Sequence, residues 1–207
     1  MKDCCSNENK TYDLIVVGAG SAGFSASITG AEAGKRVALI GHVTIGGTCV
    51  NFGCVPSKAM IRAAEALHGA SAAARFPGLS GSAKVDDWSK LMAGKDDLVA
   101  TLRQKKYADL LPNYEGVDYI DEGPATLIEG GVQVGSRKIT APKVLIATGS
   151  QTLVPAIRGI EDVPTLDSKS LLELETLPES LIFIGAGYIG AELAQMMSRM
   201  GVKVTMV

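Results

Sequence analysis

Residues 13–23 read DLIVVGAGSAG, an apolar run that enters a glycine-rich turn. The run predicts a short buried strand, and a helix of small residues is expected over residues 24–33. Gly34 ends that helix, and residues 36–40 (RVALI) give a second strand. A strand, a glycine-rich turn, a helix and a second strand make up the βαβ unit that binds dinucleotides. The chain is therefore predicted to be an α/β protein with a Rossmann-like, three-layer domain.

The residues of the turn have separate tasks in such a unit. Gly18 makes the tight turn, Gly20 lets a pyrophosphate approach the backbone, and Gly23 lets the helix pack closely against the strand. Ser21 and Ala22 lie between these glycines, where the helix begins. We predict that all five residues bind the dinucleotide.

The same pattern returns near the end of the sequence. Residues 181–184 (LIFI) enter a second glycine-rich turn, and residues 202–207 (VKVTMV) give the closing strand. Two βαβ units in one chain predict two dinucleotides. The candidate binding residues of the second unit are Gly185, Gly187, Tyr188, Ile189 and Gly190.

Two cysteines stand five positions apart in residues 47–58, GTCVNFGCVPSK. A short loop that contains Gly53 joins Cys49 to Cys54, and such a loop can close into a disulfide without strain. We predict a redox-active dithiol beside a bound cofactor; the alternative is two free cysteines in a buried core. A structural zinc site is not favoured, because four cysteines and two histidines supply no second pair at zinc spacing.

Composition restricts the classes of function. With 207 residues, 46% hydrophobic residues and a net charge of -2, the chain belongs to the soluble globular class and shows no sign of nucleic-acid binding. No apolar run approaches the ~20 residues of a membrane span. Residues 1–11 are polar and lack the apolar core of a signal peptide, so we expect a cytoplasmic protein. Cys4 and Cys5 lie in this tail, outside the predicted site.

Helices and short strands are expected between the two βαβ units. The segment from Lys58 to Arg75 is rich in alanine, and a second helical stretch spans residues 87–111. A buried strand over residues 143–148 ends in Ala-Thr-Gly. The short segments that we expect to form a small β-meander are residues 117–120, 125–128 and 131–134.

The cysteine motif, together with its order after the first βαβ unit, resembles the flavin disulfide reductases. This family includes glutathione reductase, dihydrolipoamide dehydrogenase and mercuric reductase. Thr44-Ile45 before the motif and residues 60–64 (MIRAA) after it are most similar to the mercuric reductases. The resemblance implies FAD in the first unit and a nicotinamide cofactor in the second, with hydride passing from the nicotinamide to the flavin and then to the dithiol. NADPH is expected from the resemblance alone, since these residues do not distinguish it from NADH.

The resemblance also implies roles for the two cysteines. Cys54 is the thiol nearest the flavin, and Cys49 is the outer, exchanging thiol. Soft thiolates suit soft metal ions, so we expect the pair to bind Hg(II) as substrate and the enzyme to reduce it to Hg(0). One alternative is a small disulfide substrate, as in a dihydrolipoamide dehydrogenase or glutathione reductase. An alternative of another class is a non-catalytic, thiol-based metal-binding flavodomain.

Further site residues follow from the same resemblance. Lys58 is expected to pair with Glu192 beside the flavin; the less favoured alternative is an unrelated surface lysine and helix glutamate. Tyr107 resembles an active-site tyrosine and Tyr188 a ring that covers the nicotinamide; packing alone explains both positions about as well. The other cofactor-binding residues that it implies, besides Lys58, are Gly47, Thr48, Gly53, Ala125, Thr148 and Gly149.

One position departs from the family's pattern. Gly41 ends the second strand, where the family has a glutamate that hydrogen-bonds the adenosine ribose. A glycine has no side-chain acceptor, so adenosine affinity is expected to fall by about 1 to 3 kcal/mol unless His42, water or another residue replaces it.

The resemblance divides the chain into four parts. These are a polar tail (1–11), an FAD-binding domain with the dithiol (12–150), a connection (151–178) and the start of an NAD(P)-binding domain (179–207). We expect the sequence to be truncated within this last domain and inactive in isolation. A homodimer is expected of the full-length family and does not follow from these residues.

Overall fold

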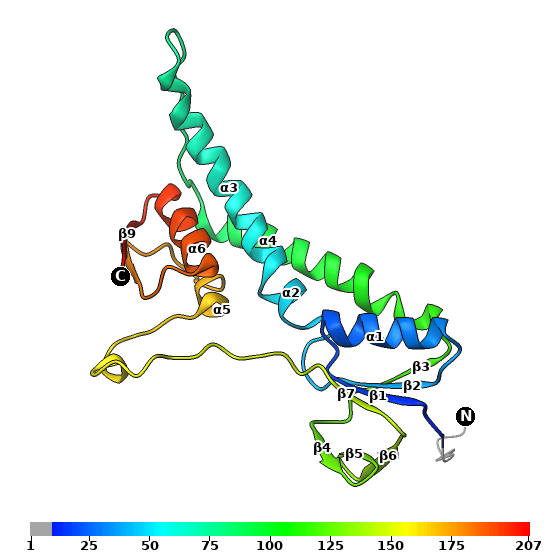
Figure 1. Ribbon diagram of the computed structural model, residues 1–207. Helices are drawn as coiled ribbons and strands as arrows, with labels where there is room; N and C mark the ends of the chain where they lie inside the picture. The colour runs from blue at the N-terminus through cyan, green and yellow to red at the C-terminus, as the bar shows by residue number, and fades with distance from the viewer. Residues whose placement is uncertain (1–9) are drawn as a thin grey trace. The chain divides into compact units, whose positions relative to one another are not determined.

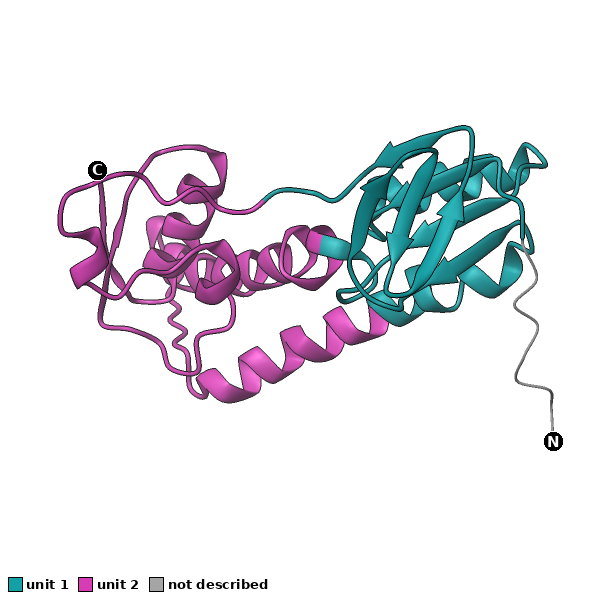
Figure 2. Cartoon of the chain, turned by 90° about the horizontal axis from the view of Figure 1, so that it is seen from below, with its two compact units in different colours: residues 1–47, 103–150 teal, residues 48–102, 151–207 magenta. Residues whose placement is uncertain are grey.

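The computed structural model describes residues 10–207, so Cys4 and Cys5 lie outside the described range (Figure 1). The chain forms two compact units (Figure 2). Unit 1 contains the described residues up to Gly47 together with residues 103–150. Unit 2 contains residues 48–102 and 151–207. Each unit is assembled from two separate stretches of chain.

Unit 1 is built on a four-stranded parallel sheet with the strand order β3-β2-β1-β7. Its order reverses beside β1, because the chain continues to β2 on one side and returns as β7 on the other. Dinucleotides bind at such a reversal, outside the carboxyl ends of the strands. The strands are β1 (Leu14–Val17), β2 (Val37–Ile40), β3 (Val117–Ile120) and β7 (Val144–Ile146).

The parallel sheet lies between a helix and a small antiparallel sheet (Figure 1). Helix α1 (Ser21–Glu32) covers one face, where Val16 and Leu39 pack with Phe24. The meander β4-β5-β6 covers the other face, where Ile15 and Ile40 pack with its own apolar residues. The two central strands, β1 and β2, are buried on both faces, which is why they are continuous apolar runs in the sequence. The predicted three-layer, Rossmann-like α/β fold is confirmed.

The meander differs from the one predicted. It consists of β4 (Ala125–Ile128), β5 (Gly131–Val134) and β6 (Arg137–Thr140). Residues 117–120, which we assigned to the meander, instead form β3 and pair with β2 in the parallel sheet. That assignment was wrong because a short apolar run does not reveal which sheet it joins. The strand β6 was missed because Arg137 and Lys138 open it with two charges.

Unit 2 is mainly helical. Its helices include α3 (Cys54–Ala72), α4 (Trp88–Arg103), α5 (Ser168–Leu171) and α6 (Tyr188–Arg199). Helix α6 connects two parallel strands, β8 (Ser180–Phe183) and β9 (Lys203–Met206). This is the second βαβ unit expected from the sequence.

The core of unit 2 joins its two stretches of chain. Met60 on α3 packs with Met196 and Met197 on α6, and Leu171 and Leu172 complete the cluster. These last two residues lie in the segment predicted as a connection, which contains the short helix α5.

One buried and one half-buried polar side chain tie α4 to the chain after α5. The indole Nε1 of Trp88 donates a hydrogen bond of 2.8 Å to the carbonyl of Leu174. The ammonium of Lys95 donates one of 2.8 Å to the carbonyl of Leu172 and pairs with Asp96. Each buried donor therefore has a partner, as a buried polar group requires.

Of the two long helical segments, the first ends where predicted and the second is divided into shorter pieces. Helix α3 continues into a 3-10 turn, η1 (Ala73–Arg75), close to the predicted end. The stretch predicted as one helix over residues 87–111 is α4 followed by a π-helical turn, η2 (Gln104–Ala108), and a 3-10 turn, η3 (Leu111–Asn113). Within residues 10–207, no helix has both the length and the apolar character needed to cross a membrane.

Candidate functional site

The first glycine-rich turn fills the switch point of the parallel sheet. Gly18 has φ +115°, and a Cβ at this position would lie 2.2 Å from the carbonyl oxygen of Ala147, directly after β7. A Cβ on Gly23 would lie 1.8 Å from the carbonyl oxygen of Gly18. The amide of Gly18 also donates to the carbonyl of Ile40 at 2.8 Å. Glycine at these two positions therefore lets the ends of β1 and β7 and the start of α1 meet.

The start of α1 fits a phosphate group. Gly20 is the N-cap and offers no side-chain acceptor, and the first turn of α1 has no acidic residue. The amides of Ser21, Ala22 and Gly23 begin the helix, where the backbone carries a partial positive charge. Glycine-rich backbone followed by such a helix end is the arrangement that accommodates a dinucleotide pyrophosphate.

The same turn contacts the segment that leads to the cysteines. Gly47 has φ +61°, and a Cβ there would lie 2.6 Å from the Cα of Gly20. Beside it, the amide of Gly46 donates to the carbonyl of Ala19 at 2.9 Å. Any side chain at residue 47 would separate these two stretches of unit 1, which accounts for the glycine.

An open pocket of about 750 Å³ lies within unit 1, lined by the loop after β2, the end of β3 and the turns η2 and η3. This volume is in the range of roughly 300 to 1,000 Å³ that small-molecule and cofactor sites occupy. Its position at the carboxyl ends of two parallel strands is where nucleotides bind in this fold. The lining residues are His42, Val43, Thr44, Ile45, Ala108, Leu111, Tyr119 and Asp121.

Tyr107 lies on the π-helical turn η2 and contacts α1. Its hydroxyl is 3.1 Å from the Oγ of Ser21, and its ring meets that of Phe24 edge to face at 4.8 Å. Inserted π-turns often occur at functional sites. The structure thus joins two predicted site residues, Tyr107 and Ser21, while the catalytic role of Tyr107 stays a prediction.

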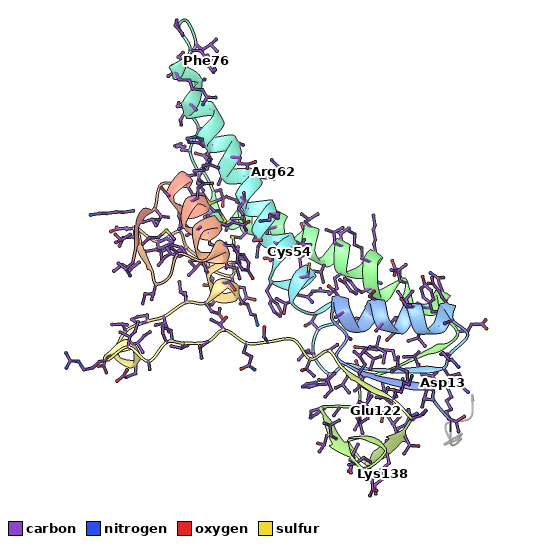
Figure 3. All side chains as sticks on the ribbon, viewed as in Figure 1. Asp13, Cys54, Arg62, Phe76, Glu122 and Lys138 are labelled. Atoms are coloured by element: carbon purple, nitrogen blue, oxygen red, sulfur yellow. The ribbon has the colours of Figure 1, made fainter. Side chains whose placement is uncertain are left out.

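The cysteines lie on two consecutive helices. Cys49 is half-buried in α2 (Gly47–Asn51), and exposed Cys54 is the first residue of α3 (Figure 3). Both are thiols in the structure. We had predicted that a loop joins them; helix α2 was missed because glycine and threonine at its start have low helix propensity. Only the break at Phe52 and Gly53 separates the two helices.

Gly53 brings the start of α3 against α2. A Cβ on Gly53 would lie 2.9 Å from the carbonyl oxygen of Thr48 and 3.2 Å from the Cα of Cys49. Cys54 follows directly in sequence, so this close approach places its backbone next to that of Cys49. The geometry requires glycine at residue 53.

Lys58 and Glu192 form an ion pair within unit 2. The Nζ of Lys58 on α3 donates to the Oε2 of Glu192 on α6 at 2.5 Å. Lys58 lies one helical turn after Cys54, so the two side chains share a face of α3. The partners are 55% and 46% exposed, and exposed pairs contribute only about 0.2 to 1 kcal/mol to stability. The predicted Lys58–Glu192 ion pair is present in the structure. Its catalytic role stays a prediction.

Sequence reasoning missed a second cation at the dithiol segment. The ammonium of Lys169, on α5, lies 4.9 Å from the ring centre of Phe52, which stands between the two cysteines. A cation over an aromatic ring is attracted by the ring's electrons. Nothing near Lys169 in the sequence indicated this contact, because it depends on how unit 2 folds.

The second glycine-rich turn repeats the first. Gly185 has φ +97°, a Cβ on Gly190 would lie 2.7 Å from the carbonyl oxygen of Gly185, and Gly187 caps α6 without a side-chain acceptor. Tyr188 is 82% exposed and Ile189 is exposed beside it. The turn therefore presents an open helix end that fits a second dinucleotide.

Three predicted cofactor residues lie elsewhere in unit 1. Ala125 begins β4 of the meander. Thr148 and Gly149 follow β7; the Thr148 amide is 3.1 Å from the position of a Cβ on Gly18, and Gly149 has φ +76°. Thr148 therefore adjoins the first turn, whereas the role of Ala125 has no contact here to support it.

Comparison with known proteins gives three consistent findings. Residues 12–207 match the family described as "Pyridine nucleotide-disulphide oxidoreductase". Mercuric reductases from Streptomyces lividans and Staphylococcus aureus are 43% and 45% identical over 94% and 97% of the chain. The chain spans only 42% and 36% of the lengths of these two relatives. The HOCl-induced flavoprotein disulfide reductase RclA from Escherichia coli superimposes with a TM-score of 0.78 at 36% identity, covering 94% of this chain and 41% of that one.

Proposed function

Because the chain belongs to the pyridine nucleotide-disulphide oxidoreductase family, we propose that it carries the FAD site and the redox-active dithiol of an NADPH-dependent reductase that acts on Hg(II). FAD would be held by the first glycine-rich turn and the pocket beyond β2 and β3. NADPH would be held by the second turn. The enzyme would work in the cytoplasm, where thiols are kept reduced.

The observation that carries this proposal is the pair of cysteines on two consecutive helices, joined through Gly53. Cys49 lies on α2 and Cys54 begins α3, and Gly53 between them lies close against the backbone of Thr48 and Cys49. Cys54 also stands at the positive end of a 19-residue helix, where negatively charged groups are favourable. Two soft sulfur ligands from one short segment suit Hg(II). The similarity to mercuric reductases supports the same substrate.

The cysteines would take part in two electron transfers. Reduction of a Cys49–Cys54 disulfide takes up two electrons and two protons and gives two thiols. Loss of both protons lets the two sulfurs bind one Hg(II), and two further electrons release Hg(0) and leave two thiolates. Bound FAD would supply these electrons, received as hydride from NADPH.

A second candidate substrate is a small disulfide. The similarity to RclA, which is described as a disulfide reductase, favours it. Thiolate attack on the substrate would give a mixed disulfide, and attack by the second cysteine would release two reduced thiols and leave Cys49 and Cys54 oxidised. The protein groups would be the same, and only the electron acceptor would differ.

The experiment uses the 207-residue chain with Cys4→Ser and Cys5→Ser, so that only the predicted pair can react. FAD is added, the chain is reduced, and Hg(II) is titrated while bound mercury and free thiols are measured. We expect a flavin spectrum changed by the protein and one Hg(II) bound per chain with loss of both thiols. Cys49→Ser is the matched control and should lose tight Hg(II) binding.

The outcomes separate the candidates. Because the chain is expected to be inactive with NADPH in isolation, the bound flavin is reduced photochemically. Release of volatile Hg(0) by the reduced protein, and not by Cys49→Ser, supports the mercury proposal. Retention of Hg(II), together with reduction of oxidised glutathione or lipoamide by the photoreduced protein, supports the disulfide substrate. A chain that leaves the FAD spectrum and fluorescence unchanged contradicts the flavoprotein proposal itself.

A further inference from the structure

Gly41 has no room for a side chain. It is buried directly after β2, and a Cβ there would lie 2.7 Å from the Cβ of Ala19 and 3.1 Å from the hydroxyl of Tyr119. The Cε2 atom of the Tyr119 ring is 3.2 Å from the same point. A side chain at residue 41 would therefore force Ala19 to shift and press against the ring of Tyr119 in its observed position. The departure from the family's pattern is matched by a tyrosine on the neighbouring strand.

Tyr119 reaches this position through strand pairing. It lies on β3 opposite Leu39 of β2, so its side chain is on the α1 side of the sheet, near the carboxyl end of both strands. The ring lines the pocket beyond these strands. Among the described residues, its hydroxyl has no hydrogen-bond partner. An accessible, unpartnered hydroxyl thus faces the place where the family's acidic side chain would act.

The Tyr119 hydroxyl is suited to bind a neutral, hydroxyl-bearing group. Burial raises its pKa, and the nearby charge of Asp121 raises it further. It therefore stays protonated at neutral pH and can both donate and accept a hydrogen bond. A ribose diol is a ligand of this kind.

We propose that the hydroxyl of Tyr119 replaces the missing acidic side chain at residue 41 and hydrogen-bonds the adenosine ribose of the dinucleotide held in unit 1. The inference rests on the proposed FAD site and adds a residue that the sequence pattern did not indicate. It also explains how Gly41 is compatible with flavin binding.

The test measures the dissociation constant of FAD by flavin fluorescence, so it needs no turnover. Tyr119→Phe keeps the ring and removes only the hydroxyl, and we expect FAD to bind about fivefold more weakly, as the loss of one neutral hydrogen bond implies. An FAD analogue without the two adenosine ribose hydroxyls should bind both proteins equally. Asp121→Asn is the control for the other polar side chain beside Tyr119 and should change FAD affinity less than Tyr119→Phe.

Each other outcome has a definite meaning. If wild type and Tyr119→Phe bind FAD equally well, the inference is overturned. It is also overturned if Tyr119→Phe weakens the binding of FAD and of the analogue by the same factor, because this would indicate a change in the pocket rather than a lost ribose contact. A larger loss in Asp121→Asn assigns the ribose to that carboxylate and also overturns it. Failure of the wild type to bind FAD contradicts the proposed function instead.

Discussion

The glycines of this chain differ in which atoms a Cβ at their position would contact. A Cβ on Gly23 would overlap the carbonyl of Gly18, whereas nothing lies within 4 Å of a Cβ on Gly94 in the middle of α4. The first glycine is required by close packing at the dinucleotide turn. The second only adds flexibility to a helix, where glycine costs about 0.5 to 1 kcal/mol relative to alanine.

Alanine substitutions should therefore have opposite effects at these two positions. We expect Gly23→Ala to lower the free energy of unfolding by at least about 2 kcal/mol, because the turn must open to admit the methyl group. Gly94→Ala should raise it by about 0.5 to 1 kcal/mol. Urea unfolding followed by circular dichroism measures both, and a destabilised Gly94→Ala would show that α4 is not an ordinary helix at this point.

Asp118 makes the stability of unit 1 depend on pH. Burial alone would raise the pKa of this carboxyl, but hydrogen bonds from Lys10 and Tyr12 and the charges of Lys10 and Arg36 lower it below its usual value. A carboxyl with a lowered native pKa stabilises the fold at any pH above its unfolded value of about 3.9. That contribution is lost as the pH falls from there through the lower native pKa.

Asp118→Asn should consequently be destabilising only where the carboxylate is charged. We expect a loss of about 1 kcal/mol at pH 7 that shrinks below about pH 4 and disappears at lower pH. Urea unfolding at a series of pH values checks this. The control is Asp86→Asn, since the Asp86 side chain is 85% exposed and should give no comparable pH dependence.

At the scale of elements, the break between α2 and α3 controls the dithiol. Gly53 allows α3 to start against the backbone of Thr48 and Cys49. A methyl group there would push the two helices apart, and a disulfide tolerates little change in the separation of its Cα atoms. The glycine therefore acts on redox chemistry through the spacing of two helices.

Gly53→Ala should make the Cys49–Cys54 disulfide harder to form. We expect the equilibrium constant for its oxidation by glutathione to fall about tenfold, which corresponds to about 1.4 kcal/mol. Thiol titration in glutathione buffers of known ratio measures it, in the background lacking Cys4 and Cys5. Gly69→Ala, inside α3 with nothing within 4 Å of its Cβ, is the matched control; an equal effect of both substitutions would contradict the role of Gly53.

The sequence predicted the elements with strong local patterns. Strands β1 and β2 and helix α1 were expected close to their observed bounds, since buried apolar runs and glycine-rich turns act locally. The assignment of β3 to the meander failed because sheet membership depends on distant residues. The contacts of Tyr119 with Gly41 and of Lys169 with Phe52 were not predicted, for the same reason. The first could have been inferred from the Rossmann strand order, in which the third strand lies next to the second.

At the scale of the whole molecule, the same glycine-rich turn occurs in both units. Each unit has a parallel βαβ with a positive-φ glycine one or two positions after its first strand. In each, the amide of this glycine donates to the carbonyl at the end of the second strand or just beyond it. Gly18 pairs in this way with Ile40, and Gly185 pairs with Val207. Both units therefore contain a helix that begins at a glycine-rich turn without a side-chain cap, the arrangement that fits a dinucleotide pyrophosphate.

The edge strand β7 has a consequence for handling the protein. It ends the sheet order of unit 1, so one side of its backbone is unpaired among the described strands, and Ile146 on it is 60% exposed. Unpaired, apolar strand edges recruit strands from other molecules and promote aggregation. We expect the chain to form concentration-dependent aggregates, and Ile146→Lys to reduce them several-fold in light scattering, with Lys138→Arg on the meander as a control. Solubility, and with it the yield of any preparation, would then be limited by one short strand rather than by the core.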